Sequence, residues 1–363
     1  MYIYLEDNLV NIDYKKHPQY IDSLLNLISS SINGYNILDA KRKTFQSLMD
    51  LGIFSEYHCS CIKQIMTFNF DHKETYKDIP YKIYITNRYS SVTKDADNNF
   101  WFVPLDLIKY GSFDAIELLG EDLSDAQLLI HAAEHYRKNN KLRGFNISIC
   151  PRNGGGQNMP INFLSSLELG KNFIVAFCDS DKFSPKGGLG AASSSCKKIS
   201  ENDQLLGIFF HTDGREIEND IPFFFIQESL SADTQVSSRL AYLFDLVEKL
   251  PQPFIKYLDL KEGLKRSWLS KLGNGSDNQV FWNDVMSDLI QLEKISEASE
   301  DEIILPSISG KMASSVLAWL EYNTKNTPKN VHQEILNCPS AEAWRRHGET
   351  IFWLGCSMKK LRV

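Results

Sequence analysis

Four short apolar runs, each ending in a group of polar side chains, constrain the fold of this 363-residue chain more than any other feature. The runs are AIELLG, FNISIC, FIVAFC and LLGIFF, and all of them lie between residues 114 and 222. Stretches with helical signals separate one run from the next. Short, continuous apolar runs are typical of parallel strands whose two faces are both covered by helices. The pattern therefore predicts an α/β fold with a parallel sheet.

The rest of the chain divides around this core. Residues 1–112 combine two stretches of helical spacing with the strand-like runs YKIYIT and FWFV, and they predict an N-terminal α+β unit. The core is expected to span residues 113–230. From residue 231 to 363 the apolar spacing is helical, which predicts a helical C-terminal domain. One of its expected helices, over residues 254–272, is basic and carries Lys256, Lys261, Lys265, Arg266 and Lys271.

Composition, charge and cysteine content limit which classes of protein this chain can belong to. The chain is 43% hydrophobic and 23% charged, as in an ordinary globular protein, and its net charge of −7 argues against binding nucleic acid through overall positive charge. A local basic groove beside a metal site stays compatible with that charge. The seven cysteines are an odd number, which favours reduced thiols. With no signal peptide pattern and no apolar run of membrane length, we expect a cytoplasmic protein without a membrane partner.

Acidic residues gather where the apolar runs stop. In open parallel sheets, ligands bind beyond the carboxyl ends of the strands. We therefore expect five side chains to converge there, namely Glu121, Asp125, Asp179, Asp181 and Glu218. Carboxylates this close repel one another unless cations lie among them, and oxygen ligands without histidine favour Mg²⁺ or Mn²⁺ over zinc. Such ions activate water and stabilise a leaving oxygen, so the sequence predicts hydrolysis of phosphodiester bonds.

The same residues resemble a known family. The segment Glu121-Asp122-Leu123-Ser124-Asp125, the glycine-rich turn 154–156, Asp179-Ser180-Asp181 and Arg215-Glu216-Ile217-Glu218-Asn219 together look like the Toprim domain. The version is the one found in OLD-family and related bacterial anti-phage nucleases. The resemblance covers about a third of the chain. It implies a Toprim-like parallel sheet core flanked by the N-terminal unit and the helical C-terminal domain.

The resemblance also implies roles for single residues. Glu121 would ligate metal and act in acid/base chemistry, and Asp179 and Asp181 would be metal ligands. Asp125 and Glu218 would serve a second ion, with Glu216 as the alternative to Glu218. In similar nucleases a lysine stabilises charge on the phosphorane, a role that Lys186 would take here.

Partners follow from the same resemblance. It implies the effector of a bacterial antiviral defence system, acting on DNA or RNA. The sequence contains no G-x-x-x-x-G-K-S/T motif, so nucleotide-driven regulation would come from an ATPase or sensor partner. The choice between DNA and RNA, and between a monomer and a homo-oligomer, stays open.

The sequence leaves two alternatives to the nuclease. The first is a catalytically inactive, Toprim-shaped adaptor that binds a partner protein. The second is a zinc peptidase, because His131-Ala132-Ala133-Glu134-His135 spells the H-x-x-E-H motif of inverted zinc peptidases. The helix that carries this motif must also cover the sheet, and a polar outer helix face accounts for both histidines without metal.

Overall fold

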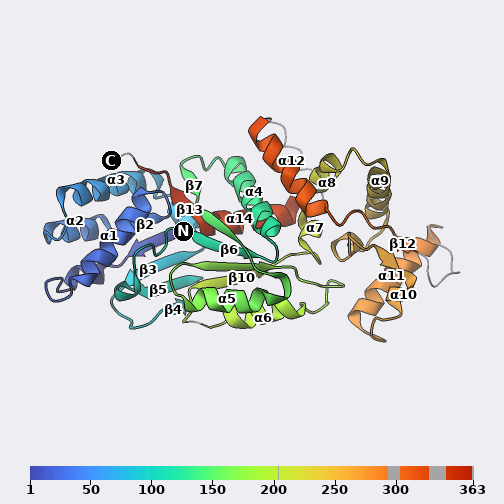
Figure 1. Ribbon diagram of the computed structural model, residues 1–363, viewed down its shortest axis with the longest axis horizontal. Coiled ribbons are helices and arrows are strands. Elements are labelled where there is room, and N and C mark those ends of the chain that lie inside the picture. Colours follow the sequence, from blue (N-terminus) through green and yellow to red (C-terminus); the bar gives the residue numbers. More distant parts are fainter. Residues whose placement is uncertain (96, 203, 293–302, 327–340, 362–363) are drawn as a thin grey trace. The chain divides into compact units, whose positions relative to one another are not determined.

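The computed structural model describes residues 1–95, 97–202, 204–292, 303–326 and 341–361 (Figure 1). They form two compact units. The first consists of Met1–Ala176, Cys196–Phe209 and His347–Val363, and the second of Phe177–Ser195 and Phe210–Arg346. Helices alternate with parallel strands, which confirms the predicted α/β class.

The first unit contains a five-stranded sheet in the order β2-β1-β3-β5-β4. Its strands are β1 (Tyr2–Leu5), β2 (Ile37–Ala40), β3 (Lys82–Thr86), β4 (Thr93–Asp95) and β5 (Phe100–Pro104). β1 is parallel to both β2 and β3, and β3 is parallel to β5. The sequence predicts β3 and β5 as strands on either side of a polar turn. Both strands are confirmed, but they are parallel neighbours, and the short strand β4 is the antiparallel hairpin partner of β5.

Three helices connect these strands: α1 (Gln19–Ile32), α2 (Arg42–Asp50) and α3 (Glu56–His72). The first two confirm the predicted helical stretches. Parallel strands joined through helices make this region an α/β arrangement, whereas the sequence predicts α+β.

Three of the four apolar runs supply β6 (Ile116–Gly120), β9 (Ile174–Cys178) and β10 (Gly207–His211). The run FNISIC is instead divided between β7 (Phe145–Ile147), which belongs to another sheet, and the first residues of β8 (Ile149–Asn153); the sheet order is β10-β9-β6-β8. β6 and β8 are parallel, and every residue of β9 is buried. α4 (Leu123–Asn139) packs on β6 and β8. α5 (Met159–Glu168) lies on the opposite side of the strands (Figure 1). Helices on both faces explain why the central strand β9 is apolar and buried along its whole length.

Residues from the far end of the chain complete the first unit. α14 (Ala341–Gly355) leads into β13 (Cys356–Met358), which pairs antiparallel with β7 (Phe145–Ile147). The Met1 amino group donates to the Cys356 carbonyl oxygen, and Leu361 N–H donates to Ile32 O at 2.9 Å.

The second unit is mainly helical, but it differs from the predicted C-terminal domain 231–363, because it also takes in residues 177–195 and 210–230 while residues 347–363 belong to the first unit. Its elements are α7 (Ile217–Asp220), α8 (Phe223–Ser229), α9 (Thr234–Lys249), α10 (Arg266–Leu269), α11 (Asp277–Gln291), α12 (Met312–Asn326), β11 (Leu264–Lys265) and β12 (Ile303–Leu305). The helix α6 (Ala191–Ser200) is divided, with residues 191–195 in the second unit and 196–200 in the first. The core of the second unit includes Phe225, whose ring lies 5.6 Å from that of Trp319 and 5.7 Å from that of Trp344.

The predicted basic helix over residues 254–272 is wrong. Phe254–Lys256 is a short 3-10 helix, Leu264 and Lys265 form β11, and α10 is a single turn. Gly263 has a φ of +76°, which a helix interior does not allow. The five basic residues therefore do not share one helical face.

None of the helices in the described ranges combines the length and the apolar character that crossing a membrane requires. Six of the seven cysteines lie in the described ranges and form no disulfide there, and Cys338 lies outside the described residues.

Candidate functional site

In the first unit, the predicted ligands Glu121 and Asp125 lie at the start of α4. Asp122 is the N-cap of this helix, and its backbone N–H donates to Asp125 Oδ2 at 2.8 Å in a reciprocal capping box. The sequence predicts that Ser124 and Gln127 form this box. That assignment is wrong, because Ser124 already lies within the helix while Asp122 has the extended backbone of an N-cap. One oxygen of Asp125 is thus engaged in helix capping.

The glycine-rich turn after β8 is bound to the residues that follow β6. Gly154 N–H donates to Gly120 O at 2.7 Å, and the N–H groups of Gly155 and Gly156 both donate to Glu121 O at 3.1 Å. These bonds fix the backbone of Glu121 against the turn. The glycines therefore have a structural role at this loop.

Gly120→Ala is expected to destabilise the first unit. A Cβ at this position would lie 2.6 Å from Asp122 O and 2.7 Å from Ala126 N, both of which are backbone atoms at the start of α4. Relieving that overlap requires a backbone shift, so we expect a loss of about 1–3 kcal/mol in the free energy of unfolding. Denaturant unfolding measures it. Gly188→Ala is the matched control, because a Cβ there meets nothing within 4 Å; equal stability of the two variants would refute the close-contact argument.

The H-x-x-E-H segment lies within α4. Glu134 forms an ion pair with Arg137 at 2.8 Å, and His135 is buried at 4% exposure. The expectation of a polar outer face is therefore wrong for His135. The Glu134 carboxylate, which a zinc peptidase would use as its general base, is held by an arginine one turn further along the helix.

In the second unit, Asp179 directly follows β9. Its Oδ1 accepts from Ile217 N–H at 2.8 Å, and its backbone carbonyl accepts from the Ser193 hydroxyl. Ser180 adds further bonds, since its N–H donates to Thr212 Oγ1 at 2.8 Å and its hydroxyl donates to Gly214 O at 2.5 Å. The loops after β9 and β10 are thereby held together.

Asp181 has a different environment from Asp179. It adopts the left-handed conformation with a φ of +53°, which aspartate tolerates better than most residues. Its N–H donates to Arg215 O at 2.9 Å, and its side chain lies against Gly190. The Asp181 carboxylate makes no hydrogen bond or ion pair within the described residues. Lys186, in the same loop, is exposed and also has no ion pair there.

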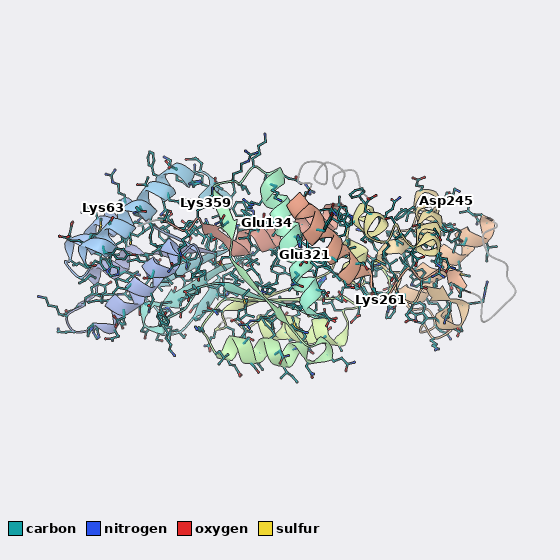
Figure 2. All side chains as sticks on the ribbon, turned by 45° about the horizontal axis from the view of Figure 1, so that its top comes forward. Lys63, Glu134, Asp245, Lys261, Glu321 and Lys359 are labelled. Atoms are coloured by element: carbon teal, nitrogen blue, oxygen red, sulfur yellow. The ribbon has the colours of Figure 1, made fainter. Side chains whose placement is uncertain are left out.

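Glu216 and Glu218 lie next to a lysine that is distant in the sequence. Lys261 Nζ is 3.1 Å from Glu218 Oε1 and 3.3 Å from Glu216 Oε2. Arg215 Nη2 is 3.1 Å from Asp259 Oδ2. Glu218 is only 3% exposed, and its Oε2 is a buried atom without a hydrogen-bond partner in the described part of the chain. We call the following set the acidic cluster: Asp179, Glu216, Glu218 and Asp259, with Arg215 and Lys261 (Lys261 is labelled in Figure 2).

The acidic cluster carries more negative than positive charge. Burial raises the pKa of Glu216, and the charges of Asp259 and Glu218 raise it further against the opposing effect of Lys261. Burial alone would lower the pKa of Lys261, but the carboxylates of Glu218 and Glu216 outweigh it and raise that pKa. Four carboxylates and two cations leave a formal charge of −2, which matches one divalent cation.

The donor set also suits a hard cation, since every acidic group offers carboxylate oxygen. In the described ranges, however, no group of three or more His, Cys, Asp or Glu side chains is already arranged to hold a metal ion. Binding of a divalent ion at the acidic cluster would therefore require side chains to turn, and Glu218 Oε2 is one buried oxygen there that lacks a hydrogen-bond partner within the described residues.

Sequence reasoning missed Lys261, Arg215 and Asp259 as members of the cluster. The sequence predicts Lys261 to lie in the basic helix. Its contact with Glu218 spans more than 40 residues of chain, and the local spacing of residues does not predict such a contact. Arg215 could have been predicted, because it directly precedes Glu216 in the segment after β10.

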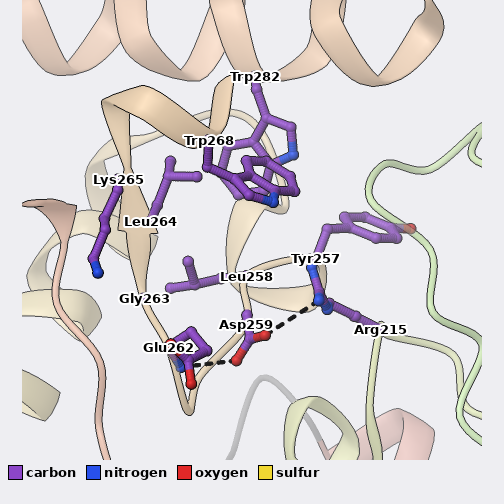
Figure 3. Close-up of a pocket in the computed structure, with 10 residues that line it drawn as sticks. All are labelled: Arg215, Tyr257, Leu258, Asp259, Glu262, Gly263, Leu264, Lys265, Trp268 and Trp282. Atoms are coloured by element: carbon purple, nitrogen blue, oxygen red, sulfur yellow. Dashed lines mark hydrogen bonds and ion pairs between the residues drawn. The ribbon is translucent and has the colours of Figure 1, made fainter. Parts of the chain in front are cut away.

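A small pocket lies beside the acidic cluster in the second unit (Figure 3). Its volume is about 180 Å³, and its walls include Trp268, Trp282 and Tyr257 together with Arg215 and Asp259. Trp282 is fully buried and donates from Nε1 to Phe183 O at 2.8 Å, whereas Trp268 is half-buried. The Arg215 guanidinium also lies 4.4 Å from the centre of the Phe183 ring. Arg215 thus belongs both to the pocket and to the acidic cluster.

Compared with known proteins, the chain matches no protein-family model, no curated protein and no solved structure.

Proposed function

We propose that this chain is a metal-dependent nuclease that hydrolyses phosphodiester bonds of DNA or RNA. The observation that supports it best is the net negative acidic cluster beyond β9 and β10, in which the buried Glu218 keeps one oxygen without a hydrogen-bond partner within the described residues. Burying carboxylates without compensating charge is costly, and a site that keeps such an excess favours a cation. Glu121 and Asp125 remain predicted ligands on the strength of the sequence resemblance, and the proposal does not depend on them.

Each part of the cluster has a role in this proposal. A bound Mg²⁺ or Mn²⁺ would supply an activated water and stabilise the leaving oxygen. Asp179 and Glu218 would hold the ion, and Ile217 N–H fixes the orientation of Asp179. Lys261 is charged at neutral pH and would favour an approaching phosphate. Lys186, exposed on its loop, would take the phosphorane contact assigned to it by the resemblance.

The pocket beside the cluster supports a nucleic acid substrate. Its volume lies below the range of roughly 300–1,000 Å³ usual for small-molecule sites, so it suits a single planar ring system. Aromatic side chains bind unstacked bases through their faces, and arginine adds a cation–π contribution. In the proposal, one unstacked base of the substrate enters between Trp268 and Arg215.

Trp268→Ala is expected to weaken binding of single-stranded DNA or RNA. Loss of one base–aromatic contact costs about 1–3 kcal/mol, which corresponds to a roughly 5- to 150-fold rise in Kd. Fluorescence anisotropy with a labelled oligonucleotide in EDTA measures it without cleavage. Tyr322→Ala removes an exposed aromatic side chain outside the pocket and serves as the control; equal affinity of both variants would rule out the pocket as a base site.

The effector role in antiviral defence and its ATPase or sensor partner also belong to the proposal, through the Toprim resemblance. A second candidate function is the inactive adaptor. It is favoured by the ion pairs of Lys261 with Glu216 and Glu218, which are also what a purely structural network would form.

Cleavage assays separate the two candidates. The purified chain is incubated with plasmid, single-stranded DNA and total RNA, in Mg²⁺, in Mn²⁺ and in EDTA. The nuclease predicts cutting of at least one substrate that requires the metal. Intact substrates under every condition, also with an ATPase partner added, would contradict the nuclease and favour the adaptor.

A further inference from the structure

The first unit contains a pocket that is distinct from the one beside the acidic cluster. The proposed nuclease does not use it. It lies where β2 ends, between α2 and α3, and its volume is about 500 Å³. That volume falls within the range of roughly 300–1,000 Å³ for sites that bind small molecules. All of its lining residues fall between Asp39 and Lys73.

Three cations surround this pocket. Arg42 comes from the start of α2, Lys63 lies on α3 (Figure 2), and Lys73 follows the end of α3. All three are exposed, and none has an ion pair within the described residues. Two nearby lysines do form ion pairs, Lys41 with Asp7 at 2.5 Å and Lys77 with Glu74. Unpaired cations that converge on one pocket favour an anionic group such as phosphate.

One wall of the pocket is apolar. Phe45 is fully buried at its base, Met66 is half-buried, and Phe70 is 73% exposed. Lys73 Nζ lies 5.5 Å from the centre of the Phe70 ring. An exposed aromatic ring beside a cation offers a stacking face for a planar group that carries a negative charge nearby.

One polar residue of the lining, Asp39, is held in place by hydrogen bonds. Asp39 accepts from Tyr2 OH at 2.6 Å, from Asn69 Nδ2 at 2.8 Å and from Ala40 N–H at 2.8 Å. A carboxylate has about four acceptor positions, so one remains on Oδ2 for a donor such as a sugar hydroxyl. Asn69 is held in turn, because its Oδ1 accepts from Tyr76 OH at 2.8 Å. These bonds keep Asp39 oriented before any ligand arrives.

We propose that this pocket binds a nucleoside phosphate. The phosphates lie among Arg42, Lys63 and Lys73, the base lies against Phe70 and Met66, and a ribose hydroxyl donates to Asp39 Oδ2. Each part of such a ligand meets a matching group on the protein. The site is separate from the acidic cluster and does not depend on the nuclease proposal.

Isothermal titration of the full chain in EDTA tests the site with four probes: ATP, AMP, adenosine and inorganic phosphate. EDTA removes any contribution from metal-bound nucleotide. We expect ATP to bind most tightly and AMP more weakly, with adenosine and phosphate at least tenfold weaker than ATP, because each makes only part of the contacts. Phosphate binding as tight as ATP, or no ATP binding at millimolar concentration, would overturn the proposal.

Variants of exposed residues place the ligand in this pocket. Arg42→Ala and Lys73→Ala are each expected to weaken ATP binding at least about tenfold, since each removes a charge-assisted contact. Phe70→Ala should weaken ATP but leave phosphate unchanged. Lys43→Ala is the matched control, because Lys43 is an exposed cation of α2 that does not line the pocket. Asp179→Asn should bind ATP as the wild type does; lost binding there, or unchanged binding in Arg42→Ala and Lys73→Ala, would overturn the assignment to this pocket.

Discussion

Glu218→Gln and Asp179→Asn are each expected to lower the rate of phosphodiester cleavage by about 100-fold or more. Both substitutions preserve shape but remove the negative charge that would hold a divalent ion. Changes to groups that hold or orient a catalytic metal typically cost 10- to 100-fold or more in activity or metal affinity. The measurement is the initial rate on a labelled oligonucleotide across a Mg²⁺ titration. A lost ligand should also shift the Mg²⁺ dependence to higher concentration.

Two controls keep this result interpretable. Asp245→Asn removes an aspartate of α9 whose side chain is 41% exposed, and it should retain wild-type activity. Thermal unfolding of each variant checks that the loss is not caused by unfolding. Glu121→Ala extends the series to the first unit and tests the role assigned by the Toprim resemblance. Wild-type rates in both Glu218→Gln and Asp179→Asn would remove the acidic cluster from the mechanism.

Lys261→Met is expected to lower the free energy of unfolding by about 3 kcal/mol. Removing one partner of a buried ion pair leaves the other charge uncompensated, at a cost of about 3–5 kcal/mol. Glu218 is 3% exposed, but Lys261 is 36% exposed, so solvent screening places the expected value at the lower end of that range. Denaturant unfolding in EDTA measures the loss.

Mg²⁺ gives the same variant a second readout. If the cluster binds a divalent ion, added Mg²⁺ should restore part of the stability lost in Lys261→Met, because the ion replaces the missing positive charge. In the double variant Lys261→Met/Glu218→Gln the buried charge itself is gone, so its stability should lie above that of the single variant. Identical unfolding of Lys261→Met with and without Mg²⁺ would argue that the cluster is a structural ion-pair network.

Much of the sheet could be predicted from the sequence because its strands are buried on both faces. β9 is the clearest case, since all five of its residues are buried and its run of apolar letters has no polar interruption. The sequence also shows the polar residues that follow each strand. Asp179 does lie directly after β9, where its carboxylate receives the N–H of Ile217.

The features that sequence reasoning missed depend on contacts between distant residues. The sequence predicts that Leu264 lies in a basic helix, but in the structure it pairs with Leu305 in a two-stranded sheet. A Cβ at the neighbouring Gly263 would lie 2.5 Å from Leu305 O, which explains the glycine. In the same way, the sequence does not reveal that the hairpin partner of β5 is the short strand β4 and not β3. Local spacing does not encode such pairings.

The position of β13 has a consequence for the order in which the protein folds during synthesis. β7 and Met1 belong to the early part of the chain, yet their partners in β13 are made only after the whole second unit has been synthesised. At 5–20 residues per second, synthesis of the intervening segment lasts on the order of ten seconds. During that time the edge of β7 is without its neighbour, so the nascent first unit presents an open strand that chaperones or a neighbouring nascent chain can pair with. A truncation before Cys356 would make that exposure permanent, and aggregation during expression would be its visible result.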